Sequence, residues 1–301
     1  MISVVIPHYK DKKRLYTNLQ HNLPFLKDCE IIIVNDFPEI SLKKEVGQLF
    51  PTVILIENER NRGFAGAASV GINHSKNPYV FLLNDDVVLK NDSFKTALKY
   101  FDKDISLFAV SFRQVEKNGN FVGRNTIYWA GGFFRHKKGN SDKNGVNGWA
   151  EGGAMMFEKK KYEIIQGFDE LYAPFYWEDI DLSYRAWKVG YTIYFDSQVL
   201  VEHYHESTIA THFKKSYINT IAYRNQLITI WKNISDLQYM REHIVCLAKN
   251  CILSLFKGNC EFIKGFWMAL LLLPQIMKKR DQQKKLWKKD DKELFEQFNS
   301  L

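Results

Sequence analysis

Cysteine is scarce in this sequence and shows no pattern. Four of the 301 residues are cysteines and none forms a Cys-x-x-Cys pair, so neither a disulfide framework nor a zinc site is indicated. With seven prolines, 17 glycines and no internal repeat, the chain is not collagen-like, and 46% apolar residues exclude a mostly disordered one. We therefore expect a globular protein in a reducing compartment.

Long hydrophobic runs are also lacking. Stretches without a charged residue reach at most thirteen residues, as in 265–277, whereas a transmembrane helix needs about 20. The first residues do not form the basic segment that opens a signal peptide. The expected location is the cytoplasm.

The net charge of +8 is unevenly distributed. Residues 241–301 hold 12 Lys and Arg against seven Asp and Glu, while residues 1–240 hold 30 against 27. A nucleic-acid-binding protein usually carries its basic residues on the folded core. Here they lie at one end, beside apolar residues, so nucleic acid is not an expected partner.

Strand-length and helix-length segments alternate over the first 110 residues. Apolar, β-branched runs at 2–6, 30–34, 53–56 and 79–83 are separated by stretches of helical length at 12–22, 41–50 and 65–75. This alternation predicts an α/β fold in which helices cover both faces of a mainly parallel central sheet. Further on, the pattern predicts a strand at 154–157, a helix that ends at Gly190, strands at 191–195 and 199–201, and helices after 207.

Residues 113–148 interrupt this alternation. They contain seven glycines and seven Lys and Arg against two acidic residues, with no sustained apolar period. We expect a mobile loop or hairpin excursion that closes over a ligand, with Arg124, Arg135 or Lys137 reaching a phosphate. The alternative is a solvated surface excursion.

Polar residues follow several of the predicted strands. Because the carboxyl ends of parallel strands meet at one edge of an open sheet, we expect these residues to share a ligand site. Neighbouring carboxylates on a tight loop suit Mg²⁺ or Mn²⁺, which take oxygen ligands and share them with phosphates. Taken singly, each carboxylate could be a turn cap or an ordinary loop residue. The segments are Pro7-His8-Tyr9, Asp36 and Asn84-Asp85-Asp86.

A second acidic cluster opens the predicted helix that ends at Gly190. It consists of Glu178, Asp179 and Asp181. Acidic residues in a first turn complement the helix dipole, which alone would explain one or two of the three. Four aromatic residues precede the cluster and form either a surface for sugar stacking or part of the core: Tyr172, Phe175, Tyr176 and Trp177.

Taken in order, these segments resemble the family-2 inverting glycosyltransferases of the GT-A fold, most closely the rhamnosyltransferase-like bacterial branch. The resemblance covers about residues 1–232, and the ordered set is more specific than any single motif. It rests on Ser3-Val4-Val5-Ile6-Pro7 with Tyr9, Ile33-Val34-Asn35-Asp36, Asn61-Arg62-Gly63-Phe64-Ala65-Gly66-Ala67, Leu82-Leu83-Asn84-Asp85-Asp86, Gly153-Ala154, Gly167-Phe168-Asp169-Glu170, Glu178-Asp179-Ile180-Asp181-Leu182, Arg185, Gly190, His203 and Arg224-Asn225.

The resemblance implies a Rossmann-like GT-A sheet and a role for each group of residues. Asp179 would be the catalytic base, and Asp86 with His203 would hold Mn²⁺ or Mg²⁺, His205 being a rival for His203. Ser69 and Lys10 stand where the family often has asparagine, and these two departures bear on which sugar donor is selected. The implied donor-binding residues are Pro7, Tyr9, Asp36, Asn61, Gly63, Asn84 and Asp85, and the implied acceptor-binding residues are Gly153, Ala154, Trp177, Glu178 and Asp181.

The implied reaction moves a sugar from a nucleoside-diphosphate sugar to a hydroxyl of a glycan or lipid-linked acceptor, with inversion, in bacterial surface polysaccharide synthesis. The helix N-terminus should keep Asp179 ionised and therefore a weak base. A sugar nucleotidyltransferase would need a basic, glycine-rich loop after the first strand, and a non-catalytic carbohydrate-binding relative should lack Asp179 or Asp86. A dinucleotide-dependent oxidoreductase would need Gly-x-Gly-x-x-Gly where Pro7 begins a different segment.

The expected organisation is a catalytic domain, 1–232, followed by a basic helical extension, 233–301. The domain would comprise a nucleotide-sugar half at about 1–110 and an acceptor half at about 149–232. In the extension, an apolar segment at 262–277 is followed by lysines, among which Trp287, Leu294 and Phe298 recur at helical spacing. This pattern predicts a basic amphipathic element on an anionic membrane surface. The protein would then be peripheral on the inner face of the cell membrane. The alternative is packing on the catalytic domain or a homo-oligomer interface.

Overall fold

The computed structural model describes residues 1–203 and 212–299. Its first part is a set of βαβ units, as the alternation of apolar runs predicts. The elements are β1 (Ile2–His8), α1 (Lys12–Asn22), β2 (Glu30–Asn35), α2 (Lys43–Leu49), β3 (Ile54–Glu57), α3 (Gly63–His74) and β4 (Tyr79–Leu83).

The strands of this part pair in parallel and are covered on both faces. β1 lies between β2 and β4, and β2 also pairs with β3. Val4 and Val5 on β1 are both fully buried, yet they belong to different core clusters, because successive side chains of a strand point to opposite faces. The predicted parallel sheet with helices on both faces is confirmed here.

The second part completes the sheet with strands of both directions. Its elements are β5 (Val87–Leu89), a 3₁₀ helix (Ser93–Ala97), α4 (Leu98–Lys103), β6 (Leu107–Val115), β11 (Ala154–Glu158), α5 (Lys159–Ile164), a second 3₁₀ helix (Glu170–Tyr172), α6 (Glu178–Val189) and β12 (Thr192–His203). β11 is antiparallel to both β4 and β6, and β12 is parallel to β6. The two short strands predicted at 191–201 are one strand with an irregular register between Asp196 and Leu200.

Residues 113–148 form strands that are packed into the molecule. They contain β7 (Phe121–Val122), the hairpin β8 (Asn125–Ala130) and β9 (Phe133–Lys138), and β10 (Gly145–Val146). The prediction of a hairpin was right, but Ile127, Phe133 and Phe134 are buried in the core, so the hairpin is not a solvated excursion. Gly131 and Gly132, which have positive φ in the turn between the two strands, break the apolar alternation that would have marked the strands.

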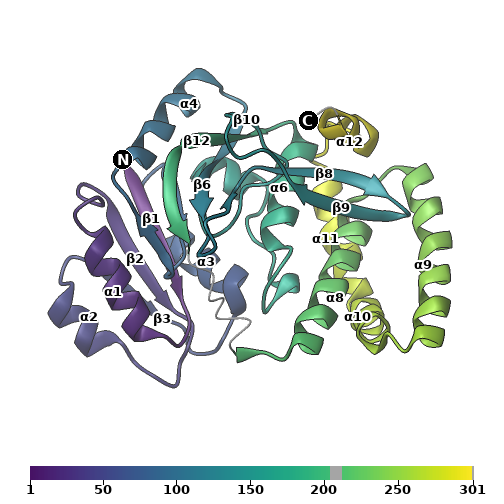
Figure 1. Ribbon diagram of the computed structural model, residues 1–301, viewed down its shortest axis with the longest axis horizontal. Coiled ribbons are helices and arrows are strands. Elements are labelled where there is room, and N and C mark those ends of the chain that lie inside the picture. Colours follow the sequence, from purple (N-terminus) through teal and green to yellow (C-terminus); the bar gives the residue numbers. More distant parts are fainter. Residues whose placement is uncertain (204–211, 300–301) are drawn as a thin grey trace.

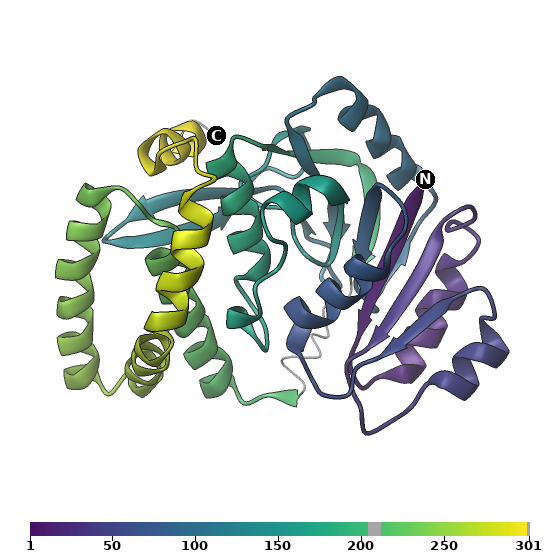
Figure 2. The ribbon, with the colours of Figure 1, turned by 180° about the vertical axis from the view of Figure 1, so that it is seen from behind.

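Within the described residues, the sheet has ten strands in the order β10-β12-β6-β11-β4-β1-β2-β3, with β5 beside β12 and β7 beside β6. The described helices that follow it are α8 (Lys215–Asn233), α9 (Leu237–Lys257), α10 (Cys260–Leu271), α11 (Leu273–Lys284) and α12 (Asp291–Asn299). α8 to α11 gather at the end of the molecule opposite β1 to β3, and the β8–β9 hairpin reaches between the two groups (Figures 1 and 2).

The last helix is part of the main core. Leu294 and Phe298 on α12 are buried, and the Phe298 ring packs edge-on against Trp187 of α6. The Asp291 carboxylate, fully buried, accepts hydrogen bonds from the Tyr184 hydroxyl and from Lys188 Nζ. The predicted amphipathic helix through Trp287, Leu294 and Phe298 is therefore wrong: the chain breaks between α11 and α12, and its apolar residues face inward.

By length and composition, none of the described helices could cross a membrane alone, and one pair, α10 with α11, passes the same criteria only when taken together across a bend of 63°.

Candidate active site

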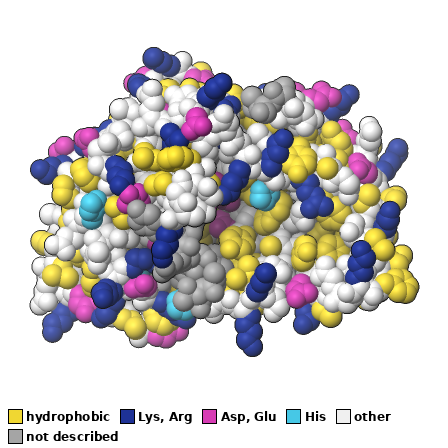
Figure 3. Space-filling view, in the orientation of Figure 1, with side chains coloured by type: hydrophobic (Ala, Val, Ile, Leu, Met, Phe, Trp, Pro, Cys, Tyr) yellow, Lys and Arg dark blue, Asp and Glu magenta, His cyan; other side chains and the backbone are white. Residues whose placement is uncertain are grey.

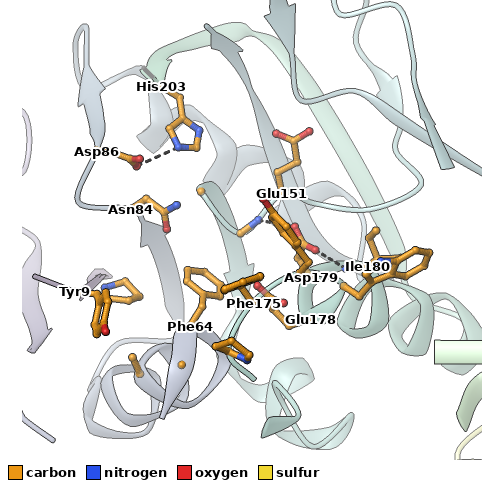
Figure 4. Close-up of a pocket in the computed structure, with 18 of the residues that line it drawn as sticks. Tyr9, Phe64, Asn84, Asp86, Glu151, Phe175, Glu178, Asp179, Ile180 and His203 are labelled. Atoms are coloured by element: carbon orange, nitrogen blue, oxygen red, sulfur yellow. Dashed lines mark hydrogen bonds and ion pairs between the residues drawn. The ribbon is translucent and has the colours of Figure 1, made fainter. Parts of the chain in front are cut away.

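A cavity of about 740 Å³ lies at the carboxyl ends of β1 and β4 and the N-terminal end of α6. Strand-end residues form one wall, and residues of the 151–153 loop and of α6 form the opposite wall (Figure 4). This is the sheet edge at which an open α/β fold binds ligands. The seven residues expected at the donor all line it: Pro7, Tyr9, Asp36, Asn61, Gly63, Asn84 and Asp85.

Asp36 shapes the donor side of the cavity. Its Oδ1 accepts hydrogen bonds from Asn58 Nδ2 (2.7 Å) and from the Arg62 backbone N–H (2.9 Å). Burial raises the pKa of Asp36, and these hydrogen bonds lower it by less. Gly63 has a φ of +69°, and a Cβ there would lie 2.9 Å from the Pro174 carbonyl oxygen. The loop thus requires glycine at this position, both for its conformation and for its close packing.

Asp85 reaches the cavity, but its carboxylate is engaged by protein groups. Oδ2 lies 2.6 Å from His8 Nδ1, and Oδ1 accepts a hydrogen bond from Arg14 Nη2 (2.9 Å). Asn18 Nδ2 also donates to the Asp85 backbone oxygen (2.9 Å). Asp85 therefore ties the end of β4 to β1 and α1, and it holds the loop from which Asp86 projects.

Asp86 and His203 lie side by side at one edge of the cavity, as the resemblance implies for metal ligands. His203 Nε2 lies 3.1 Å from Asp86 Oδ1, and His203 Nδ1 lies 2.5 Å from Gln114 Oε1 (Figure 4). Since an amide oxygen can only accept, Nδ1 carries the proton of a neutral imidazole and Nε2 is the nitrogen available to a cation. Gly153 permits this arrangement, because a Cβ there would lie 2.6 Å from His203 Cε1.

Asp86 and His203 together fit a divalent cation whose remaining coordination positions are filled by a bound ligand. One carboxylate and one imidazole suit Mn²⁺, and Mg²⁺ or Mn²⁺ commonly takes its remaining ligands from phosphates and water. Within 1–203 and 212–299, no third His, Cys, Asp or Glu joins the pair. His205, the predicted rival, lies outside the described residues.

Asp179 faces the cavity from the first turn of α6. Its Oδ2 accepts a hydrogen bond from the Gly152 N–H (3.1 Å), and its Oδ1 accepts one from the Ile180 N–H (2.8 Å). Burial, together with the smaller effect of the nearby Glu151 charge, raises the pKa of Asp179 to about 6, against the opposing effect of these two hydrogen bonds. The expectation that the helix N-terminus would make Asp179 a weak base was wrong, because the cost of desolvation outweighs the stabilisation by backbone N–H groups.

Glu178 also lines the cavity and keeps its proton more tightly than Asp179. Burial raises the pKa of Glu178 well above its ordinary value, and the charge of Asp179 adds to the effect. Its buried Oε2 has no hydrogen-bond partner among the described residues. Two adjacent carboxyl groups thus differ in protonation, with Asp179 as the one that can accept a proton near neutral pH.

Two of the predicted acceptor-binding residues lie elsewhere. Asp181 is fully buried behind the cavity, where its carboxylate accepts hydrogen bonds from Arg185 Nε, Lys232 Nζ and Tyr172 (2.9 Å each). Asp181 therefore fixes α6 to α8, and Tyr172 belongs to the core. Ala154 is buried in β11 and is absent from the cavity lining among the described residues. Gly153, Trp177 and Glu178 line the cavity as predicted.

The sequence model of glycosyl transferase family 2 matches residues 3–164, more than half of the chain. The chain belongs to this family. A dolichyl-phosphate β-glucosyltransferase from Trichomonas vaginalis is 30% identical over 110 residues, which are 33% of this chain and 34% of that protein. The chain thus matches about a third of the length of this curated relative.

Solved structures with the same fold include other glycosyltransferases. A structure of GalNAc-T7 with UDP, GalNAc and Mn²⁺ has a TM-score of 0.59 at 14% identity, covering 77% of this chain and 48% of that one. A Pyrobaculum calidifontis mannosyltransferase with GDP-Man and Mn²⁺ has a TM-score of 0.53 at 13% identity, covering 90% of this chain and 86% of that one. Residues 1–349 of TarS from S. aureus have a TM-score of 0.56 at 13% identity, covering 92% of this chain and 82% of that one. These likenesses confirm the predicted GT-A fold.

Several cavity residues of this family-2 chain were not predicted. On β9, His136 and Lys138 line the cavity, whereas the predicted Arg135 and Lys137 alternate with them on the other face of the strand. Arg124 donates instead to the backbone oxygens of Asn140 and Lys143, in the segment between β9 and β10. The period-2 alternation of a recognised hairpin could have revealed this choice. Also missed were Phe64, Glu116, Val122, Trp149, Glu151, Gly152 and Phe213.

Proposed function

We propose that this protein transfers a sugar from a nucleoside-diphosphate sugar to a hydroxyl of a glycan or lipid-linked acceptor, in a single displacement that inverts the anomeric carbon. One observation carries the proposal: a single cavity combines Asp179, whose pKa is about 6, with the Asp86–His203 pair at the strand ends where donors bind. The UDP and GDP-Man of the similar structures support a nucleotide donor, and their Mn²⁺ supports a divalent cation.

Asp179 is the residue that takes up a proton in this mechanism. The acceptor oxygen bonds to the anomeric carbon, the bond from that carbon to the diphosphate oxygen breaks, and the acceptor's proton passes to an Asp179 carboxylate oxygen. A base with a pKa near the working pH is effective in such a step, which is worth typically 10²–10⁴-fold. The N–H groups of Gly152 and Ile180 hold the carboxylate in place.

Asp86 and His203 are the residues that would hold Mn²⁺ or Mg²⁺. When bound, such a cation supplies neutralisation of the negative charge on the departing diphosphate. Gln114 orients the His203 ring, and Asp85 positions the Asp86 loop through its contacts with His8 and Arg14. Asp85 and Asp86, although adjacent, therefore have different partners because one positions the loop and the other would bind the cation.

The acceptor side is the part of the cavity around Trp177 and Glu178. Aromatic side chains give it flat apolar walls of the kind on which sugar rings stack, while Glu178 offers a carboxyl group to a hydroxyl. The name of the T. vaginalis relative includes dolichyl phosphate, which supports a lipid-linked acceptor. Membership of the rhamnosyltransferase-like branch and a role in bacterial surface polysaccharide synthesis stay predictions.

A ligand-binding screen followed by a transfer assay tests the proposal. UDP, GDP and dTDP should each be assayed for a rise in melting temperature with Mn²⁺, with Mg²⁺ and with chelator, since a ligand that binds the native state stabilises it. We expect at least one nucleotide to stabilise the protein only with a cation, and its sugar conjugate to be turned over. Absence of stabilisation by any of them would contradict donor binding, and binding without turnover would favour a non-catalytic carbohydrate-binding protein. Transfer of a nucleotidyl group would favour a nucleotidyltransferase.

A further inference from the structure

Helix α9 exposes an apolar surface along its length. Of its 21 residues, His243 and Ser254 are the ones that are buried. Its inner side contacts the β8–β9 turn, where a Cβ on Gly132 would lie 2.5 Å from Cys246 Cβ. Its outer side carries large apolar residues at helical spacing, and the exposed fraction reaches 69% for Val245 and 86% for Phe256. The others are Leu237, Ile244, Ile252, Leu253 and Leu255.

The neighbouring helix α10 has the same two-sided character. Its inner side packs closely on α8, since a Cβ on Gly265 would lie 2.8 Å from the Thr220 carbonyl oxygen. Its outer side exposes 57% of Trp267 and 80% of Leu271, four residues apart and therefore on one face. Ten of the 19 large hydrophobic residues that are exposed in the described chain lie within residues 237–277. Such concentration marks an interaction surface, whereas single exposed apolar residues are ordinary.

The same segment carries the basic charge of the protein. Residues 237–289 hold 11 Lys and Arg against three Asp and Glu, a net charge equal to the +8 of the whole chain. One of the three acids, Glu242, accepts hydrogen bonds from Trp129 Nε1 and the Gly132 N–H and faces the hairpin. Figure 3 shows apolar side chains with Lys and Arg among them over the end of the molecule formed by α8, α9 and α10. The exposed basic residues of α9 and α10 are Arg241, Lys249, Lys257 and Lys264.

We infer that the outer faces of α9 and α10 dock on an anionic lipid bilayer. Apolar side chains, a tryptophan and flanking lysines are what an interfacial helix uses, the first two entering the acyl boundary and the last contacting the headgroups. A second copy of the chain suits the surface less well, because a two-fold contact places each patch on itself and would oppose two equally basic segments. This inference goes beyond the proposed function and does not depend on it.

This surface coincides only in part with the membrane element expected from the sequence. Of that element, Leu294 and Phe298 are buried in the core, whereas the segment 262–277 contributes the exposed Trp267 and Leu271 of α10. The surface on α9 and α10 lies at the end of the molecule away from β1 to β3, on the side of the acceptor half (Figures 1 and 2). Docking there leaves the nucleotide half directed toward solvent.

Vesicle co-sedimentation of the full chain tests the inference. Vesicles of phosphatidylcholine alone and of phosphatidylcholine with phosphatidylglycerol would be compared at low and high salt. The test variant is Ile252→Glu with Phe256→Glu, and the matched control is Ile105→Glu, whose side chain is 92% exposed outside this segment. We expect wild type and control to bind anionic vesicles and to lose binding as salt rises, and the double variant to bind about tenfold more weakly or less.

Three results would overturn the inference. They are no binding to anionic vesicles, equal binding to both vesicle types at both salt concentrations, and a wild-type dimer that survives high salt but is lost in the double variant. The last would assign the surface to a second copy. Melting curves establish that the variants fold, and unchanged stabilisation by a nucleoside diphosphate with Mn²⁺ separates failure of docking from failure of the proposed function.

Discussion

Replacement of Asp179 by Asn is the sharpest test of the proposed mechanism. The amide keeps the size of the side chain and can still accept a hydrogen bond from the Gly152 or Ile180 N–H, but it cannot take up a proton. We expect turnover to fall by about two orders of magnitude or more, with donor affinity nearly unchanged. Raising the pKa of Asp179 from 3.8 to about 6 corresponds to about 3 kcal/mol against its ionised form. The variant should therefore melt no earlier than wild type, because it removes a charge that desolvation disfavours.

The pH dependence of the wild-type reaction follows from the same pKa. Asp179 acts as a base only when ionised, so activity must fall as the pH drops through about 6. One ionisation with this pKa makes kcat/KM at pH 5 about tenfold lower than at pH 7. Below the midpoint, a plot of log(kcat/KM) against pH has a slope that approaches one. An aspartate of ordinary pKa would leave activity unchanged over this range. The profile is measured with saturating cation at constant ionic strength.

Glu151 allows a second test of the Asp179 pKa. Its carboxylate accepts hydrogen bonds from Asn125 Nδ2 (2.9 Å) and Gln114 Nε2 (2.7 Å), and its charge raises the pKa of Asp179. Glu151→Gln should move the acidic limb to lower pH, whereas Asp181→Asn on the same helix as Asp179 should leave its midpoint unchanged. Wild-type turnover in Asp179→Asn, or a midpoint near 4 in the wild type, would refute the assignment of Asp179 as the base.

Four further outcomes are expected. Asp86→Ala should abolish the Mn²⁺-dependent stabilisation by nucleoside diphosphates, and full transfer activity in chelator would contradict the metal assignment. Gly153→Ala should weaken Mn²⁺ binding about tenfold or more by displacing the histidine ring beside it, as titration calorimetry would show. Asp181→Asn should lower the free energy of unfolding by about 3–5 kcal/mol in denaturant melts, because two buried cations lose a partner. Lys138→Met should raise a substrate KM while Arg135→Met, on the opposite face of β9, should not; equal effects would contradict the placement of this strand.

The sequence alone was sufficient for the parallel half of the sheet and its edge. Apolar strand runs and intervening helices are local patterns, and a parallel sheet places the residues after each strand at one edge whatever the rest of the chain does. Asp36, Asn84 and Asp86 could therefore be assigned to one site from the sequence alone. Asp179 and His203 could be named from the ordered motifs, because each motif lies at a fixed place along the chain.

Tertiary structure decided the properties that depend on distant neighbours. The pKa of Asp179 is set by burial and by Glu151, 28 positions earlier in the chain, so a helix-dipole argument from local sequence gave the wrong direction. Asp181 has the same residue type and lies in the same helix turn as Asp179, the proposed base, yet its contact with Lys232 makes it part of the core. The burial of Phe298 against Trp187 likewise depends on a contact between segments more than 100 residues apart. A pattern of helical spacing shows that one face is apolar, but only the fold determines whether that face meets the core or the solvent.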